Sequence, residues 1–226
     1  MKYYVYVSQT KLEMLHGQVR SQKSKKREAS IGFDIKVLKG EIKDSREMDD
    51  SAHSKLTETI SQLDEAGMIG TLRSSRSPFI RGTCDMIWAS YGWRPNSGIT
   101  FWAYRHNDLV LALAGSKYHI LGEQRDGHAH SHSLTDEIAN WIYTNVAEPF
   151  PKEAQAQAAS WSGDRSLNNE SIANGIWLAV TQADGQTSKF EFVAKVLHQS
   201  KWPNGFRDGR SKRVVLASPL YVSLEQ

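Results

Sequence analysis

The segment Gly115–His119 (GSKYH) ends a long apolar run and places polar groups where the chain turns. Gly115 lets a backbone approach closely, and Ser116, Lys117 and His119 offer a hydroxyl group, a cation and an imidazole beside exposed N–H groups. These groups suit an anion such as a phosphate. The structural alternative is a glycine bulge that turns a strand, followed by a surface lysine.

The turn Ser8–Lys11 (SQTK) connects an expected strand to an expected helix. N–H groups at a helix N-terminus can hold an anion, so Ser8, Thr10 and Lys11 are candidate ligand-binding residues. The turn contains no glycine and therefore lacks the phosphate-binding fingerprint. The alternative is a helix cap, in which Thr10 and Glu13 form a capping box.

Arg81 lies between Ile80 and Gly82 in an apolar segment. A partly buried guanidinium group needs a carboxylate or a ligand as its partner. Asp85 is close in sequence, so a structural ion pair is the alternative to a ligand contact at Arg81.

Three histidines alternate along a polar segment: His128, His130 and His132. On a strand they would share one face and could bind zinc or nickel. We expect a solvent-exposed loop instead, because the segment precedes a helix and has neither paired cysteines nor an HExxH motif. The GxSxG, Walker and CxxC motifs are absent from the sequence as well. We therefore assign no catalytic residue, no metal site and no cofactor.

Two apolar runs, Ile99–Tyr104 and Leu109–Ala114, form the centre of the expected core. Continuous apolar runs with β-branched and aromatic residues predict strands covered on both faces. The turn Arg105–Asp108 between them predicts a β-hairpin. Much of the core should therefore come from the stretch Phe79–Gly122.

The remaining elements are predicted from hydrophobic periodicity and turn residues. Helices are expected from Thr10 onward, over Ser51–Gly67 and over Ser133–Val146. Strands are expected over Lys2–Val7, over Ile31–Lys43, and over Arg213–Leu224 with a break or bulge at Pro219. A further hairpin is expected to pair Gly175–Thr181 with Lys189–His198.

These elements predict the α+β class, with a mostly antiparallel sheet of about seven or eight strands and three main helices. Strands and helices do not alternate regularly, which argues against a doubly wound α/β fold. We expect a single domain over residues 1–226, with a long polar insertion or lid at about 152–174.

Composition limits the classes of function. The net charge is +3, with 28 Lys and Arg against 25 Asp and Glu, so nucleic acid ranks last among the expected partners. Cys84 is the one cysteine of the sequence, which favours a reducing compartment. No signal peptide and no apolar run of membrane-spanning length is evident, so we expect a cytoplasmic protein without a membrane partner.

Four blocks of sequence resemble an uncharacterised bacterial family that is best represented in actinobacteria. The blocks are Lys2–Leu15 (KYYVYVSQTKLEML), Phe79–Gly92, Leu113–Gly122, and the pair Phe190–Ala194 and Ala217–Val222. They span nearly the whole chain in the same order. The resemblance implies one compact domain of unknown function in a conflict or antiviral-defence setting, and it implies no reaction.

We expect a ligand-sensing or adaptor module that binds a small anionic, nucleotide-like molecule. Lys11, Arg81 and Lys117 would neutralise its charge, and Ser116 and His119 would form hydrogen bonds. One alternative is a nucleotide-directed hydrolase or phosphodiesterase that uses His119 as an acid or base. The other is a protein-interaction module without a small ligand, with a protein partner in a defence system.

Overall fold

The computed structural model describes residues 2–24, 50–73, 77–94, 97–106, 108–122, 173, 176–177, 179–181, 183–202 and 212–225. The N-terminal part consists of β1 (Tyr3–Val7), α1 (Gln9–Ser24), α2 (Asp50–Glu65) and β2 (Ile69–Thr71). The central part consists of β3 (Phe79–Arg94), β4 (Ser97–His106), β5 (Leu109–Ser116) and the short 3-10 helix η1 (Lys117–His119). The last strands are β6 (Thr187–Trp202) and β7 (Lys212–Leu224).

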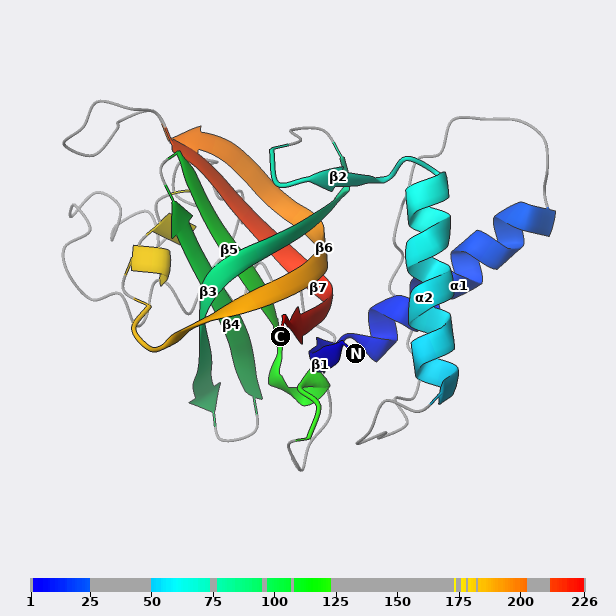
Figure 1. The fold of residues 1–226 in the computed structure, drawn as a ribbon, viewed down its shortest axis with the longest axis horizontal. Helices are drawn as coiled ribbons and strands as arrows, with labels where there is room; N and C mark the ends of the chain where they lie inside the picture. The colour runs from blue at the N-terminus through cyan, green and yellow to red at the C-terminus, as the bar shows by residue number, and fades with distance from the viewer. Residues whose placement is uncertain are drawn as a thin grey trace, which may run out of the picture.

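Five strands close into a barrel in the order β3-β4-β5-β7-β6-β3 (Figure 1). The long strand β3 makes closure possible, because residues 87–94 pair with β4 while residues 79–87 pair with β6. β7 runs parallel to β5 and antiparallel to β6. This order, with the third and fifth strands parallel, is that of five-stranded Greek-key barrels of the OB type.

The α+β class is confirmed, and most of the described strand pairs are antiparallel as expected, but the sheet is not simply antiparallel and part of it closes into a barrel. The described part of the sheet has seven strands and is mixed, because the pairs β5–β7 and β2–β3 are parallel. Local turn signals predicted the β4–β5 hairpin correctly. They contain no information on the pairing of β7 with β5, whose residues lie about a hundred positions apart.

The barrel interior is filled by large side chains from every strand of the ring. Trp102, Phe190, Phe192 and Leu111 are fully buried there. Trp88 stacks on Trp102 with the ring centroids 5.8 Å apart, and its Nε1 donates to Thr100 Oγ1 at 2.7 Å. The predicted central stretch therefore does supply much of the core.

A second apolar layer lies outside β4, β5 and β7. The described residues between 173 and 181 are helical, and Ala173, Ile176 and Val180 pack against Phe101, Ala112 and Val214. The strand expected over Gly175–Thr181 is therefore wrong. A short apolar run fits either structure, and here the spacing i, i+3, i+7 places its buried residues on one helix face.

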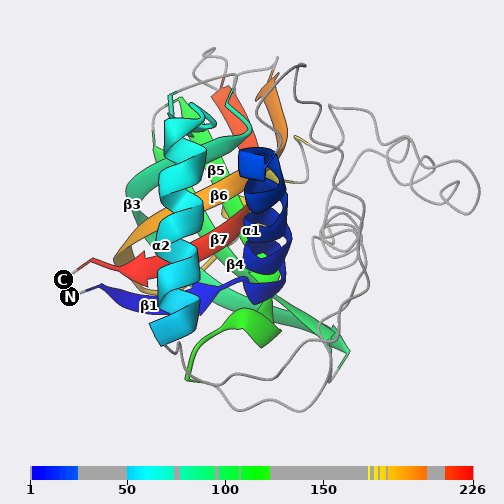
Figure 2. The same ribbon diagram turned by 90° about the vertical axis from the view of Figure 1, so that its right-hand side faces the viewer.

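The helices α1 and α2 cover the barrel on another side, which is on the right in Figure 1 and faces the viewer in Figure 2, where α2 crosses in front of the strands. Leu12 and Leu15 of α1 and Leu56 and Leu63 of α2 pack with Phe79, Val193 and Leu220. The hydrophobic periodicity from which both helices were predicted thus corresponds to a buried face on each of them. Gly67 ends the second helix with φ +66°, as its predicted C-cap role requires. The expected capping by Thr10 is wrong by two positions, since α1 begins at Gln9.

Several expectations lie outside the described residues: the strand Ile31–Lys43, the helix Ser133–Val146, the histidines His128, His130 and His132, and nearly all of the segment 152–174. Among the helices that are described, none combines the length and the apolar character needed to cross a membrane.

Candidate functional site

The strand β7 changes partners near its middle. It pairs with β5 as far as Ala217 and with β1 from Tyr221 onward, and a bulge at Leu220 interrupts its register with β6. The residues between these two pairings need other hydrogen-bond partners. We call the surrounding polar cluster the β7 fork; it comprises Tyr6, Ser8, Thr10, Lys11, Gly115, Ser116, His119, Lys195 and Ser218.

Short connections bring the fork residues together. Only Ser8 separates β1 from α1, and its N–H donates to Leu220 O at 2.8 Å, so Lys11 lies in the first helical turn directly beside β7. On the other side β5 runs into η1, which brings the His119 ring to 5.8 Å from the Tyr6 ring. Leu121 N donates to Val5 O at 3.0 Å and holds this turn against β1.

The side chain of Lys11 bonds to β7 at the point where the strand changes partners. Its Nζ donates to Ser218 Oγ at 2.5 Å and to Pro219 O at 3.1 Å. Ser218 Oγ in turn donates to Ala114 O at 3.2 Å. Lys11 therefore satisfies acceptors at the fork, and all of these acceptors are neutral.

Two lysine side chains, Lys11 and Lys195, place positive charge at the fork. Burial, followed by the nearby charge of Lys195, lowers the pKa of Lys11 to about 7. The Lys11 residue keeps some exposed surface along its chain, so it is the ammonium group that is withdrawn from water. Lys195 lies opposite Ser218 in the β6–β7 register, and burial lowers its pKa as well. In the described part of the chain, no carboxylate contributes to the pKa shift of Lys11.

His119 is held in its neutral form. Burial lowers the pKa of its imidazole to about 4, and the charge of Lys11 acts in the same direction. At neutral pH the ring therefore offers one N–H donor and one acceptor nitrogen rather than a second positive charge.

Two buried hydroxyl groups of the fork lack hydrogen-bond partners among the described residues: Tyr6 Oη and Thr10 Oγ1. The Ser8 side chain and the Ser116 backbone are close enough to Tyr6 to affect its pKa, which burial raises, but neither makes a hydrogen bond of standard geometry. A buried hydroxyl without a partner costs free energy, so these two groups are unfavourable in the fork as described.

Gly115 has no side chain, and this leaves room for the Tyr6 ring. A Cβ atom at position 115 would lie 2.6 Å from Tyr6 Cζ and 2.8 Å from Tyr6 Cε2. Another group therefore packs closely against the backbone of this glycine, as expected, and that group is the aromatic side chain of Tyr6.

Of the predicted site residues, the structure brings Ser8, Lys11, Gly115, Ser116 and His119 together, and Thr10 precedes Lys11 in the first turn of α1. Lys117 follows on η1, with its Nζ 6.0 Å from the Tyr118 ring centroid, and Ser116 Oγ accepts a hydrogen bond from Tyr118 N at 3.4 Å. Sequence reasoning missed Tyr6, Lys195 and Ser218. No local pattern marked Lys195 as a site residue, and only the pairing of β6 with β7 places it at the fork.

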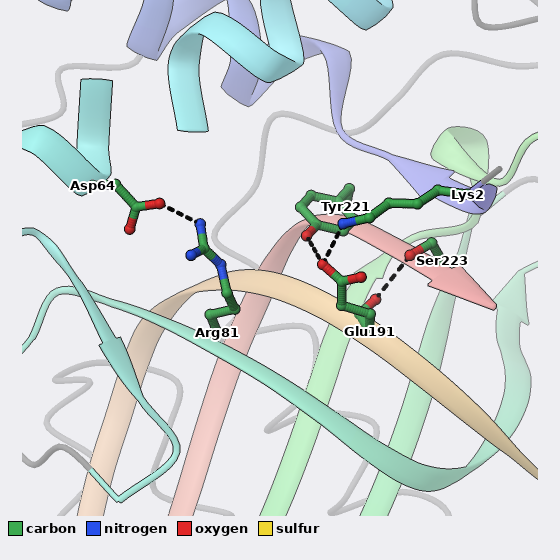
Figure 3. A network of polar contacts seen from close by, with 6 residues as sticks. All are labelled: Lys2, Asp64, Arg81, Glu191, Tyr221 and Ser223. Carbon is green, nitrogen blue, oxygen red and sulfur yellow. Dashed lines mark hydrogen bonds and ion pairs between the residues drawn. The ribbon is translucent and has the colours of Figure 1, made fainter. Parts of the chain in front are cut away.

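Arg81 belongs to a separate network (Figure 3). Its Nη2 forms an ion pair with Asp64 Oδ2 of α2 at 2.6 Å. Arg81 therefore makes a structural ion pair, the alternative to a ligand contact, but its partner is Asp64 rather than Asp85. Next to this pair, Glu191 accepts from Tyr221 Oη and from Lys2 Nζ, both at 2.6 Å. Burial alone would raise the pKa of Glu191, but these hydrogen bonds and the charges of Lys2 and Arg81 lower it overall.

Metal binding finds no support in the described part of the chain, which contains no cluster of three or more His, Cys, Asp or Glu residues of suitable geometry. The residues of the fork are instead donors and cations, which suit an anion.

The chain was compared with known proteins. No curated protein and no solved structure matches it. Residues 2–226 match a family of unknown function, DUF7019. Because the match spans nearly the entire sequence, the chain belongs to this family of unknown function.

Proposed function

We propose that this protein is a ligand-sensing or adaptor module that binds a small anionic, nucleotide-like molecule at the β7 fork. The observation that carries the proposal is the meeting of Lys11 and Lys195 with no carboxylate acting on Lys11 among the described residues. A buried cation is costly without a counter-charge, and an anionic ligand would supply one. The bacterial-defence setting implied by the sequence resemblance is part of the same proposal.

The surrounding groups support an anion rather than a neutral ligand. Among the described residues, the Thr10 hydroxyl has no hydrogen-bond partner and the Tyr6 hydroxyl has none of standard geometry, and both groups can donate. Hydrogen bonds from charged donors are about twice as strong as those between neutral groups. Because the anion favours the charged amine, binding should raise the pKa of Lys11 and should strengthen as the pH falls from 9 to 6.

The experiment has two steps. Mass spectrometry of the denatured protein first searches for a co-purified small molecule, and calorimetry then measures binding of inorganic phosphate and nucleoside mono-, di- and triphosphates. We expect Lys11→Met and Lys195→Met each to weaken binding at least about tenfold, which corresponds to one lost charge-assisted hydrogen bond. Lys55→Met, an exposed lysine on α2, is the matched control and should leave binding unchanged. Equal affinity in the wild type and in the Lys11→Met, Lys195→Met double variant would exclude this site.

Binding is better supported than hydrolysis. A general base works best when its pKa lies near the working pH, whereas the pKa of His119 is lowered to about 4. Nucleic acid ranks low because the outer face of β4 and β5, which OB-type barrels use for oligonucleotides, is covered here by apolar residues of the segment 173–181.

A further inference from the structure

We propose that Lys11 is an amine nucleophile that forms an imine with the carbonyl group of a small anionic aldehyde or ketone. This deepens the proposed function, on which it rests, because it assigns a covalent chemistry and a ligand class to the same fork.

The hydrogen bonds of Lys11 match a neutral amine. The group donates to Ser218 Oγ and Pro219 O, and no third acceptor is present in the part of the chain that the structure describes. A neutral amine has two hydrogens and one lone pair, whereas an ammonium group would leave its third hydrogen unsatisfied in a buried position. The two bonds to β7 thus fix the amine and leave its lone pair available.

The surroundings also disfavour the charged form. The charge of Lys195 repels an ammonium group, and the first turn of α1 adds the positive end of a helix dipole. With a pKa of about 7, roughly half of the Lys11 side chains are neutral at pH 7, against about one in 2,500 for an ordinary lysine. Burial beside a second cation is an established way to activate a lysine for imine formation.

The reaction needs no oxidant or reductant. The amine lone pair attacks the carbonyl carbon, the C–N bond forms, and the carbonyl oxygen takes up the nitrogen's proton to give a carbinolamine. The carbinolamine then loses its hydroxyl group with one proton as water, which leaves a C=N bond. The anionic group of the ligand lies against Lys195 in this arrangement, so the carbonyl carbon and the anionic group contact different lysines.

The test traps the imine with borohydride and identifies the modified lysine by peptide mapping of the wild-type protein. The probe is pyridoxal 5′-phosphate, an aldehyde with a phosphate group, and pyridoxal is the same aldehyde without it. At limiting probe and pH 7.5, we expect Lys11 to be labelled at least tenfold faster than the exposed Lys55, and faster by the phosphate-bearing probe. Removal of the neighbouring charge by Lys195→Met should shift the pH midpoint of pyridoxal labelling upward.

The outcomes separate the imine from the proposed function. Preferential labelling of Lys11 by both probes to the same extent supports the amine nucleophile and removes the anion site. Binding of inorganic phosphate at the fork without labelling of Lys11 above the Lys55 level overturns the imine and leaves the anion site intact. Labelling of Lys11 at the Lys55 level together with no phosphate binding rejects both. A pH midpoint that is the same in Lys195→Met and wild type also counts against the proposal, because a purely structural Lys11 gives no such shift.

Discussion

A side chain at position 115 would occupy space that the Tyr6 ring already fills. Tyr6 is fully buried, and its ring packs edge-on against Trp102 and His119, with centroids 5.4 Å and 5.8 Å away. The ring therefore joins the barrel interior to the β7 fork. Its hydroxyl group adds no hydrogen bond of standard geometry among the described residues, so its contribution to stability comes from packing.

Gly115→Ala should destabilise the protein by about 1–3 kcal/mol, because the new methyl group forces the Tyr6 ring or the β5 backbone to move. Urea unfolding measures the change. Adding Tyr6→Phe should recover part of the loss, since the phenol oxygen lies nearest to the new methyl group. The control is Gly17→Ala in α1, where no atom lies within 4 Å of the new Cβ and the better helix propensity of alanine favours stability. Equal effects at positions 17 and 115 would contradict this account of the fork.

At this scale the sequence indicated most of the cluster and missed Tyr6, Lys195 and Ser218. Polar residues that interrupt apolar strands drew attention to Lys11 and to Ser116 and His119, and the short loops on either side brought them together. Lys195 and Ser218 gave no local signal, because their place depends on the register of β6 with β7. At Arg81 the sequence correctly indicated that the guanidinium group has a charged partner, but not which one. The carboxylate is that of Asp64 in α2 rather than that of the neighbouring Asp85.

At the scale of elements, two helical layers determine which barrel faces remain open. The helices α1 and α2 cover β6 and the end of β7, and the segment 173–181 covers β4 and β5. The sequence predicted α1 and α2 from helical periodicity, and it predicted the β4–β5 hairpin from two apolar runs that flank a turn. It could not separate strand from helix in the short run Gly175–Thr181, where packing against Phe101 and Val214 decides the outcome.

Leu56→Ala tests whether α2 is an integral part of the fold. Leu56 is 1% exposed between α1 and the barrel, so its truncation should cost about 2–5 kcal/mol in the free energy of unfolding. The adjacent Thr57 is exposed, and Thr57→Ala should change stability by less than about 0.5 kcal/mol. Urea unfolding followed by circular dichroism gives both values. A loss below 1 kcal/mol at Leu56 would mean that α2 is only loosely attached.

At the scale of the whole molecule, closure of the barrel depends on pairs of strands that are distant in sequence. β3 must meet β6, β5 must meet β7, and β1 must join the end of β7, which brings the first and last strands side by side (Figure 2). Turn chemistry encodes none of these pairings, so the mixed barrel could not be predicted from local patterns. The same dependence suggests that the barrel opens as one unit.

Cys84 offers a direct measurement of that opening. It is the one cysteine in the sequence, it lies in the barrel interior at 6% exposure, and burial and the charge of Asp85 raise its pKa to about 11. An aromatic disulfide reagent should therefore react only with molecules whose barrel has opened. If α2 and the barrel unfold together, Leu56→Ala should accelerate the reaction about tenfold for every 1.4 kcal/mol of stability lost, while Thr57→Ala leaves the rate unchanged. An unchanged rate in a destabilised Leu56→Ala protein would mean instead that the helical layer detaches from a barrel that stays closed. The β7 fork contains Lys11 from α1 and Ser218 from β7. It would then be divided between two parts of the protein that unfold separately.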